Sequence, residues 1–180
     1  IFSSTGSYGV DVDSNYNVFN YTNFTSSGAS AAGVYLTGNY SNFTNCFVNN
    51  TYVGGAGSLD AGVYFAGGAL SGFNRFTGCY VGYFDSFSSG AFYFNGGKNN
   101  TVSNNTIVST NTPGIRFQVS SPGSLVTGNF IVGANIATSG SGFYVGSNPT
   151  FFVGVNISQD NLVGRGFSGP WSPFYFFNGL

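Results

Sequence analysis

Ionisable side chains are scarce in this 180-residue sequence, which holds five aspartates, four lysines and arginines, and no glutamate, histidine or methionine. General acid–base catalysis needs a titrating group within hydrogen-bond reach of a reacting proton, commonly histidine or paired carboxylates. The aspartates are dispersed, and no histidine is present to activate a serine. The composition therefore predicts a protein that is not an enzyme.

Other classes are excluded by further absences. The four cations are scattered and form no basic stripe, which argues against nucleic-acid binding. Apolar runs are far shorter than the roughly 20 residues that span a bilayer, so no membrane span is expected. Two cysteines without histidine make no metal-ligand set, and no cofactor is expected. The chain begins with isoleucine and no charged leader, so we expect it to be processed or excised from a precursor.

What the chain has instead is apolar area and small polar residues. Hydrophobic residues make up 42% of it and aromatic residues 19%, enough for the core of one folded domain. Glycine, asparagine, serine and threonine dominate the remainder, which is not a cytosolic profile. We therefore expect a secreted protein.

Eight Asn-x-Ser/Thr sequons favour an extracellular glycoprotein, with polar composition alone as the alternative explanation. Most of them fall on positions that the repeats described below place outward or in turns. Their asparagines are Asn20, Asn23, Asn39, Asn42, Asn49, Asn99, Asn104 and Asn156.

A four-residue strand motif, Gly or Ala followed by an apolar, a variable and an apolar residue, recurs six times. The copies begin 23 to 29 residues apart, a period typical of solenoids. They occupy residues 9–12, 33–36, 62–65, 91–94, 114–117 and 142–145.

A second motif runs in phase with the first and is apolar at its first and sixth positions. Its copies occupy residues 19–24, 43–48, 76–81, 102–107, 126–131 and 157–162. The fourth position is always small and polar or a thiol, which suits a ladder of side chains that bond along the stack. The residues at that position are Thr22, Cys46, Cys79, Asn105, Asn129 and Asp160.

Alternation within the strand motif points Val63 and Phe65 to one side and Tyr64 to the other. Coils of this length hold about three short strands, and glycine and asparagine supply the left-handed backbone that the turns need. Coils stacked about 4.8 Å apart would place equivalent residues directly over one another. The expected core columns are Val10, Val34, Val63, Phe92, Ile115, Phe143 and Val12, Leu36, Phe65, Phe94, Phe117, Val145.

On these motifs the chain resembles the right-handed parallel β-helix superfamily, the pectate-lyase-like repeat proteins, over about residues 8–163. The resemblance implies an all-β right-handed parallel β-helix of about six coils. It does not specify an activity, because that fold hosts lyases, hydrolases, adhesins, viral spikes and structural proteins.

The outward column of the strand motif contains four tyrosines, Tyr35, Tyr64, Tyr93 and Tyr144. We expect them to form an exposed surface for sugar rings or another subunit; the alternative is that tyrosine merely suits strands and stacks on itself.

Similar enzymes place acidic residues, often with calcium, and a basic residue on or beside this face. Here the face has Asp11, Asp13 and Arg116. Arg116 lies four rungs from Asp11, about 19 Å away, too far to act on the same bond. Calcium at the two aspartates is conceivable, but two solvated carboxylates are favoured.

Cys46 and Cys79 occupy the same position on consecutive coils, so their Cα atoms should lie about 5 Å apart. That spacing permits a disulfide. The alternative is a pair of buried free thiols.

We expect coils over residues 1–163 and an irregular, aromatic segment over 164–180 that caps the last coil or docks on another subunit. The leading hypothesis is a secreted, glycosylated structural protein whose copies form an extracellular filament or surface assembly. The alternatives are a carbohydrate-binding or adhesin module using the tyrosine column, and a divergent polysaccharide lyase or hydrolase.

Overall fold

The computed structural model describes residues 1–6, 8–28, 31–51, 61–66, 72–83, 90–109, 113–119 and 121–133, and the backbone of 143–145, 156–157, 162–163 and 174–176. These residues form three parallel β-sheets and no helix that could cross a membrane.

Each sheet takes one strand from each of the first six coils. Sheet A contains β1 (Phe2–Ser4), β4 (Asn23–Ser26), β7 (Phe47–Asn50), β10 (Tyr80–Tyr83), β13 (Thr106–Ser109), β16 (Phe130–Gly133) and β19 (Leu162–Val163). Sheet B contains β2 (Val10–Val12), β5 (Ala32–Leu36), β8 (Ala61–Phe65), β11 (Phe92–Asn95), β14 (Ile115–Val119), β17 (Phe143–Val145) and β20 (Phe174–Phe176). Sheet C contains β3 (Val18–Asn20), β6 (Asn42–Thr44), β9 (Arg75–Thr77), β12 (Thr101–Ser103), β15 (Leu125–Thr127) and β18 (Asn156–Ile157).

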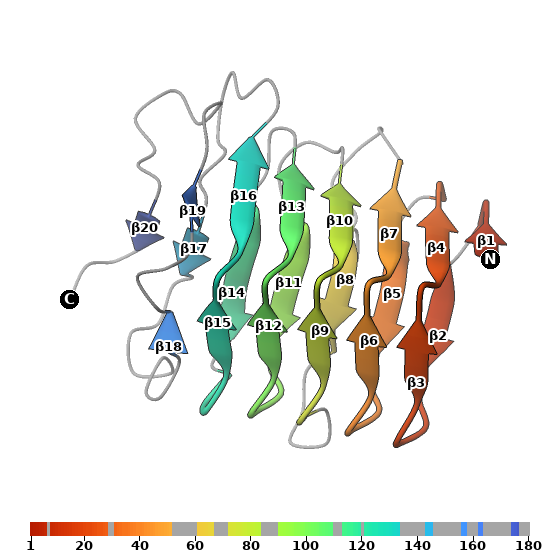
Figure 1. Cartoon of the computed structure of the whole chain (residues 1–180), viewed down its shortest axis with the longest axis horizontal. Helices are drawn as coiled ribbons and strands as arrows, with labels where there is room; N and C mark the ends of the chain where they lie inside the picture. The colour runs from red at the N-terminus through yellow and green to blue at the C-terminus, as the bar shows by residue number, and fades with distance from the viewer. Residues whose placement is uncertain are drawn as a thin grey trace.

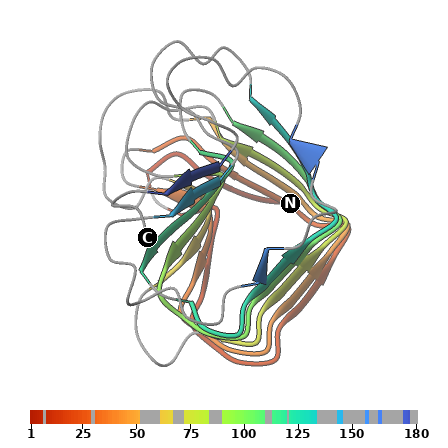
Figure 2. The same ribbon diagram turned by 90° about the vertical axis from the view of Figure 1, so that its left-hand side faces the viewer.

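The chain visits sheets A, B and C in turn, so β1, β2 and β3 form coil 1, β4, β5 and β6 form coil 2, and so on to coil 6. Figure 1 shows the coils stacked from the N-terminal to the C-terminal end, and Figure 2, along the stack, shows the sheets surrounding a core. The expected parallel β-helix of about six coils is confirmed.

Two strands begin a seventh coil. Phe174–Phe176 pairs in parallel with β17, so these three residues continue the register of sheet B. The division at residues 163 and 164 stays a prediction.

The last copy of the second motif was misaligned, because Val163 and not Leu162 pairs with Ile131. The chain has one residue more between Ile157 and that strand than the other copies have, and Asp160 itself lies outside the described residues.

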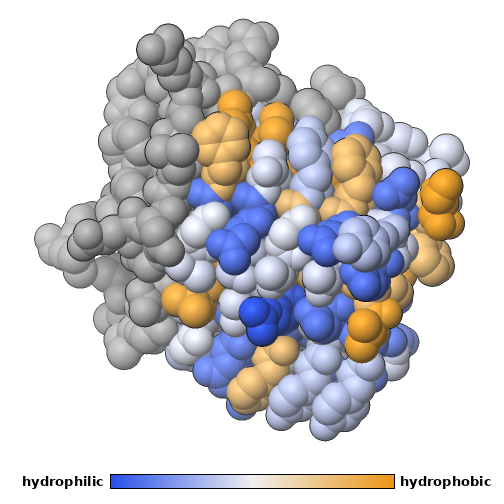
Figure 3. Space-filling model, viewed as in Figure 1, coloured by the Kyte–Doolittle hydropathy of each residue, from blue (hydrophilic) through white to orange (hydrophobic). Residues whose placement is uncertain are grey.

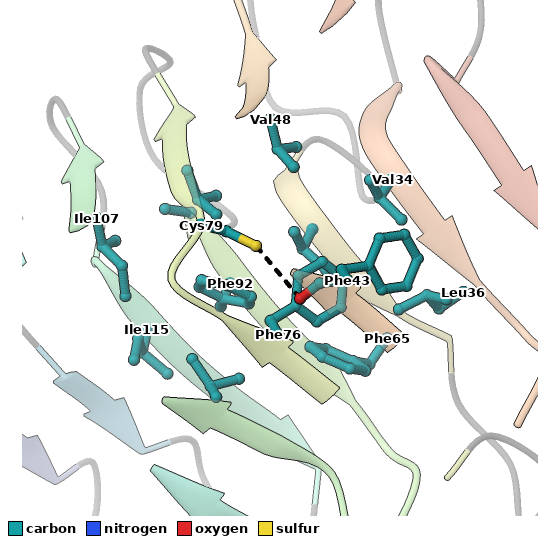
Figure 4. Close-up of a cluster of buried hydrophobic side chains, with 14 of the residues drawn as sticks. Val34, Leu36, Phe43, Val48, Phe65, Phe76, Cys79, Phe92, Ile107 and Ile115 are labelled. Atoms are coloured by element: carbon teal, nitrogen blue, oxygen red, sulfur yellow. Dashed lines mark hydrogen bonds between the residues drawn. The ribbon is translucent and has the colours of Figure 1, made fainter. Parts of the chain in front are cut away.

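The core columns confirm the predicted alternation. Phe43, Phe65 and Phe76 pack together with Cys79 at the centre of the cluster in Figure 4. Phe43 and Phe76 stack with ring centroids 4.2 Å apart, and Phe65 stacks on Phe94 at 4.3 Å. Val10 is half-buried against this core, and the side chains of Phe143 and Val145 lie outside the described part. The buried members are Val12, Val34, Leu36, Val63, Phe65, Phe92, Phe94, Ile115 and Phe117.

The corner from sheet C to sheet A uses a left-handed residue in each described coil, as predicted for glycine and asparagine. From coil 2 onward asparagine and glycine alternate. A Cβ built on Gly78 would lie 2.5 Å from Oδ1 of Asn45, and one on Gly128 would lie 2.3 Å from Oδ1 of Asn104. Each asparagine amide thus lies over the glycine of a neighbouring coil. The column is Tyr21, Asn45, Gly78, Asn104 and Gly128.

Gly62, the first residue of one strand motif, lies where sheets A and B approach closely, although Ala91 occupies the same position in the next coil. A Cβ on Gly62 would be 2.7 Å from Cγ1 of Val81 and 2.7 Å from the carbonyl oxygen of Ala91. Neither neighbour sits at the free end of a flexible side chain, so the packing cannot adapt easily.

We expect Gly62→Ala to lower the free energy of unfolding by about 1–3 kcal/mol, because the added methyl group overpacks this junction. Chemical denaturation measures the change. Gly6→Ala is the control, since nothing lies within 4 Å of a Cβ there, and it should alter stability by less than about 0.5 kcal/mol. Equal effects would contradict this account of the motif glycine.

Candidate functional site

The outward row of sheet B is a continuous stack of tyrosine rings. Tyr35 stacks on Tyr64 with centroids 5.3 Å apart, and Tyr64 stacks on Tyr93 at 5.0 Å. Tyr8 extends the stack at 4.2 Å from Tyr35. Sequence reasoning missed Tyr8 because Tyr8 precedes the first strand motif. In the strand register Tyr35 pairs with Asp11, so the motif gives no sign that the Tyr8 ring stacks on Tyr35.

The expected exposure of this row is wrong for two of its members. Tyr64 is 3% exposed and Tyr93 is 7% exposed. They belong to a second buried cluster with Ala32, Ala61 and Ala66, outside the main core, while Tyr35 is half-buried. Alternation fixes the side of the sheet to which a residue points but does not reveal what covers that side. The backbone of Tyr144 pairs with Arg116 as expected, and its side chain lies outside the described part.

Polar groups in this row satisfy one another. The Arg116 guanidinium lies 5.5 Å from the Tyr93 ring centroid and donates through Nε and Nη2 to Oε1 of Gln118, at 3.1 and 2.6 Å. The Asn95 amide donates to the Tyr64 hydroxyl at 2.8 Å. Burial raises the pKa of Tyr64 to about 12. The phenol is therefore neutral at physiological pH and unsuited to proton transfer there.

Asp11 lies in the same row, one rung from Tyr35, and the row continues through Tyr64 and Tyr93 to Arg116. The predicted separation of four rungs between Asp11 and Arg116 is thus confirmed. Burial, followed by the nearby Asp13 carboxylate, raises the pKa of Asp11. That these two carboxylates are solvated and bind no calcium stays a prediction.

The ladder at the fourth position of the second motif bonds along the stack as predicted. Oδ1 of Asn129 accepts from the backbone N–H of Asn105 at 3.0 Å, and Oδ1 of Asn105 accepts from that of Cys79 at 2.8 Å. Cys79 Sγ in turn accepts from the backbone N–H of Cys46 at 3.4 Å. The side chains thereby satisfy amide groups that are buried at the corner.

Cys46 and Cys79 are buried free thiols in adjacent coils, which is the second of the two expected alternatives. Cys79 also donates weakly to the Phe43 carbonyl at 3.5 Å (Figure 4). The side-chain hydrogen bond with the Cys46 thiol, together with burial, raises the pKa of the Cys79 thiol.

A second polar ladder, just before each strand of sheet C, was not predicted. Oδ1 of Asn74 accepts from the backbone N–H of Ser41 at 2.9 Å, and Oδ1 of Asn100 accepts from that of Asn74 at 3.0 Å. The Ser124 hydroxyl accepts from the backbone N–H of Asn100 at 3.0 Å. Each of these residues lies two positions before the first residue of the second motif, so extending that motif backward would have found the ladder.

The exposed aromatic column lies in the turn between sheets B and C, one residue before that second ladder. Tyr16, Tyr40 and Phe73, here called the turn ladder, are 73%, 46% and 42% exposed. Their rings stack at 5.0 and 4.8 Å with interplanar angles of 7° and 10°. Asn99 and Gly123 occupy the same position in coils 4 and 5.

The turn ladder carries backbone strain. Tyr16, Tyr40 and Phe73 have φ of 63°, 56° and 58°, in the left-handed region. That region costs a side chain with a Cβ roughly 1 kcal/mol or more, and asparagine and glycine occupy it most readily. Their backbone amides fix the turn by donating to carbonyls of the next coil, at 2.9 to 3.0 Å. Strain at exposed aromatic residues makes this column a candidate functional site.

Figure 3 shows the face formed by sheets A and C, where apolar and polar residues are interspersed. A second aromatic pair, the exposed Phe47 and the half-buried Tyr80, stacks at 4.9 Å on sheet A. The exposed aromatic residues thus form separate groups.

The sequon asparagines differ in accessibility. Asn20, Asn23, Asn99 and Asn104 are exposed, whereas Asn39 and Asn42 are half-buried. The Asn39 amide donates to Oδ1 of Asn15 at 3.2 Å. Asn49 is half-buried, and its Oδ1 lies inside the protein. Asn156 lies in β18, and its side chain is outside the described part.

Three stacked parallel sheets, inward columns and polar corner ladders define a parallel β-helix. The chain matches the family described as "Right handed beta helix region" over residues 1–170 and belongs to it. No match was found among curated proteins or among solved structures.

We expect alkaline destabilisation to report on the buried tyrosine stack. Because the pKa of Tyr64 is about 12 when folded and 10.0 ordinarily, the unfolded chain loses this proton first as pH rises. The associated stability, on the order of 2 kcal/mol, is complete below pH 10 and lost as pH rises to 12. Denaturation at a series of pH values measures it, and Tyr64→Phe should flatten this part of the profile. An unchanged profile in Tyr64→Phe would contradict the assignment.

Proposed function

We propose that this chain is a non-enzymatic structural protein of the extracellular space, N-glycosylated, whose copies associate into a filament or surface assembly. One observation carries the proposal: in the middle of the outward row of sheet B, the half-buried Tyr35 and the buried Tyr64 and Tyr93 stack on each other, and Arg116 packs on Tyr93. Side chains engaged in this way are not available to act on a substrate. A sequence without histidine or glutamate supports the same reading.

A carbohydrate-binding or adhesin role is the alternative, and the ring geometry weighs against it. Sugar rings stack on the faces of aromatic rings. In both tyrosine columns the faces are directed at neighbouring rings, about 5 Å away. Tyr40 stacks on a ring at each face and therefore presents mainly its edge to solvent, whereas Tyr16, at the end of the column, stacks on one ring only.

The assembly is tested by electron microscopy and light scattering of the purified, secreted chain over a range of concentrations. We expect polymers or layers that grow with concentration. A dispersed monomer at high concentration would overturn the proposed function. Cleavage of an acidic polysaccharide that is lost in Asp11→Asn would favour an enzyme instead.

Glycosylation is tested separately by mass spectrometry of chymotryptic peptides from the secreted protein. We expect glycan on the peptides with the exposed Asn20 and Asn23 and none on Asn49, because Asn49 is half-buried and its amide oxygen lies inside the protein. Asn20→Gln and Asn23→Gln should remove the corresponding mass. A protein without glycan at any of the eight sequons would contradict this part of the proposal.

A further inference from the structure

The turn ladder is a costly feature that the fold itself does not require. Coils 4 and 5 make the same turn with Asn99 and Gly123, which suit the left-handed backbone. Coils 1 to 3 use aromatic residues there and leave them exposed. Tyrosine and phenylalanine are enriched in the centres of protein interfaces, where their large surface is buried at small entropic cost.

Charge is distributed unevenly along the described part of the same stack. Among the described residues, the carboxylates Asp11 and Asp13 both belong to coil 1. Arg75 lies on β9 of coil 3, Lys98 follows β11 of coil 4, and Arg116 lies on β14 of coil 5. Lys98 is exposed and directly precedes Asn99 in the turn-ladder column, and Asp13 is exposed three residues before Tyr16. The turn face is therefore acidic at one end of the ladder and basic at the other.

A surface with this pattern is complementary to itself when one copy is reversed. A two-fold axis that crosses the face between coils 2 and 3 exchanges coil 1 with coil 4. It sets Tyr40 against Phe73 of the partner subunit, and Asp13 near Lys98 of the partner subunit. Such an isologous contact uses every favourable pair twice.

We infer that two copies of this chain pair side by side, in antiparallel orientation, through the turn ladder Tyr16, Tyr40 and Phe73. This inference rests on the proposed function, for which it identifies one of the contacts between copies. A two-fold contact closes on itself and yields a pair, so a larger assembly uses a second surface. Stacked rings present their edges, which suits burial against a partner protein better than stacking with a sugar.

The pairing places a condition on two sequons. Asn39 is next to Tyr40, and Asn99 continues the turn-ladder column, so a glycan on either would cover the contact. The Asn39 amide is already engaged with Asn15. The paired protein should therefore have no glycan at Asn39 or Asn99, and glycan at Asn99 in the paired form would overturn the inference.

The main experiment compares two variants in which a phenylalanine becomes the asparagine found in its own column. Phe73→Asn takes the residue of coil 4, where Asn99 adopts the same backbone conformation. Phe47→Asn, the control, takes the residue of coil 2, where Asn23 pairs with Phe47. Sedimentation equilibrium should show that Phe73→Asn raises the dissociation constant of the pair at least about tenfold, whereas Phe47→Asn leaves it unchanged. Circular dichroism should confirm that both variants are folded.

Charge reversal tests the orientation. Asp13→Lys and Lys98→Glu should each weaken pairing by about three- to tenfold at low salt, and the double variant should recover it. Single variants that pair as tightly as the wild type, or a double variant that pairs no better than the single variants, would overturn the antiparallel arrangement.

The outcomes separate this inference from the proposed function. Larger assemblies that persist unchanged in Phe73→Asn would overturn the turn-ladder contact and leave the proposed function standing. A wild-type pair that never grows further, and that Phe73→Asn dissociates, would support the contact and overturn the larger assembly. A monomeric wild-type chain would overturn both.

Discussion

Parallel pairing between successive coils is the constraint on which the other features of this molecule depend. It sets equivalent residues one above another at the strand spacing, so each side chain meets its counterpart from the next coil as its nearest neighbour. A column therefore works only if its residue type can pack or bond with a copy of itself. Phenylalanine and tyrosine stack, asparagine donates to and accepts from the next backbone, and charged residues repel. This accounts for the near absence of charge in the sequence.

The same constraint explains why so much of the fold could be predicted. Val63, Phe65 and their counterparts recur at fixed positions of a short motif, and period-2 alternation assigns them to the core without reference to distant sequence. The ladder from Cys46 to Asn129 was likewise visible, because its spacing from flanking apolar residues never varies in the described coils. The last copy failed because one additional residue shifts Val163 into the place expected for Leu162.

The candidate site was harder to predict for two different reasons. The burial of Tyr64 and Tyr93 depends on residues outside the motif that cover the sheet, and a strand pattern holds no information about them. The turn ladder was missed because aromatic residues are not expected in a left-handed conformation. A signal for it existed: Tyr16, Tyr40 and Phe73 each precede the first residue of the second motif by three positions, as Asn99 and Gly123 do.

The alternation of asparagine and glycine at the corner from sheet C to sheet A limits how a protein of this kind can lengthen. Gly78 and Gly128 each lie against the amide oxygen of an asparagine one coil away, at a distance that a Cβ could not occupy. Duplication of a single asparagine-bearing coil would set one asparagine directly on another and force both amides to move. Duplication of two consecutive coils would preserve the alternation. At this corner an asparagine-bearing coil can therefore be copied without rearrangement only together with a glycine-bearing neighbour, as a coil pair.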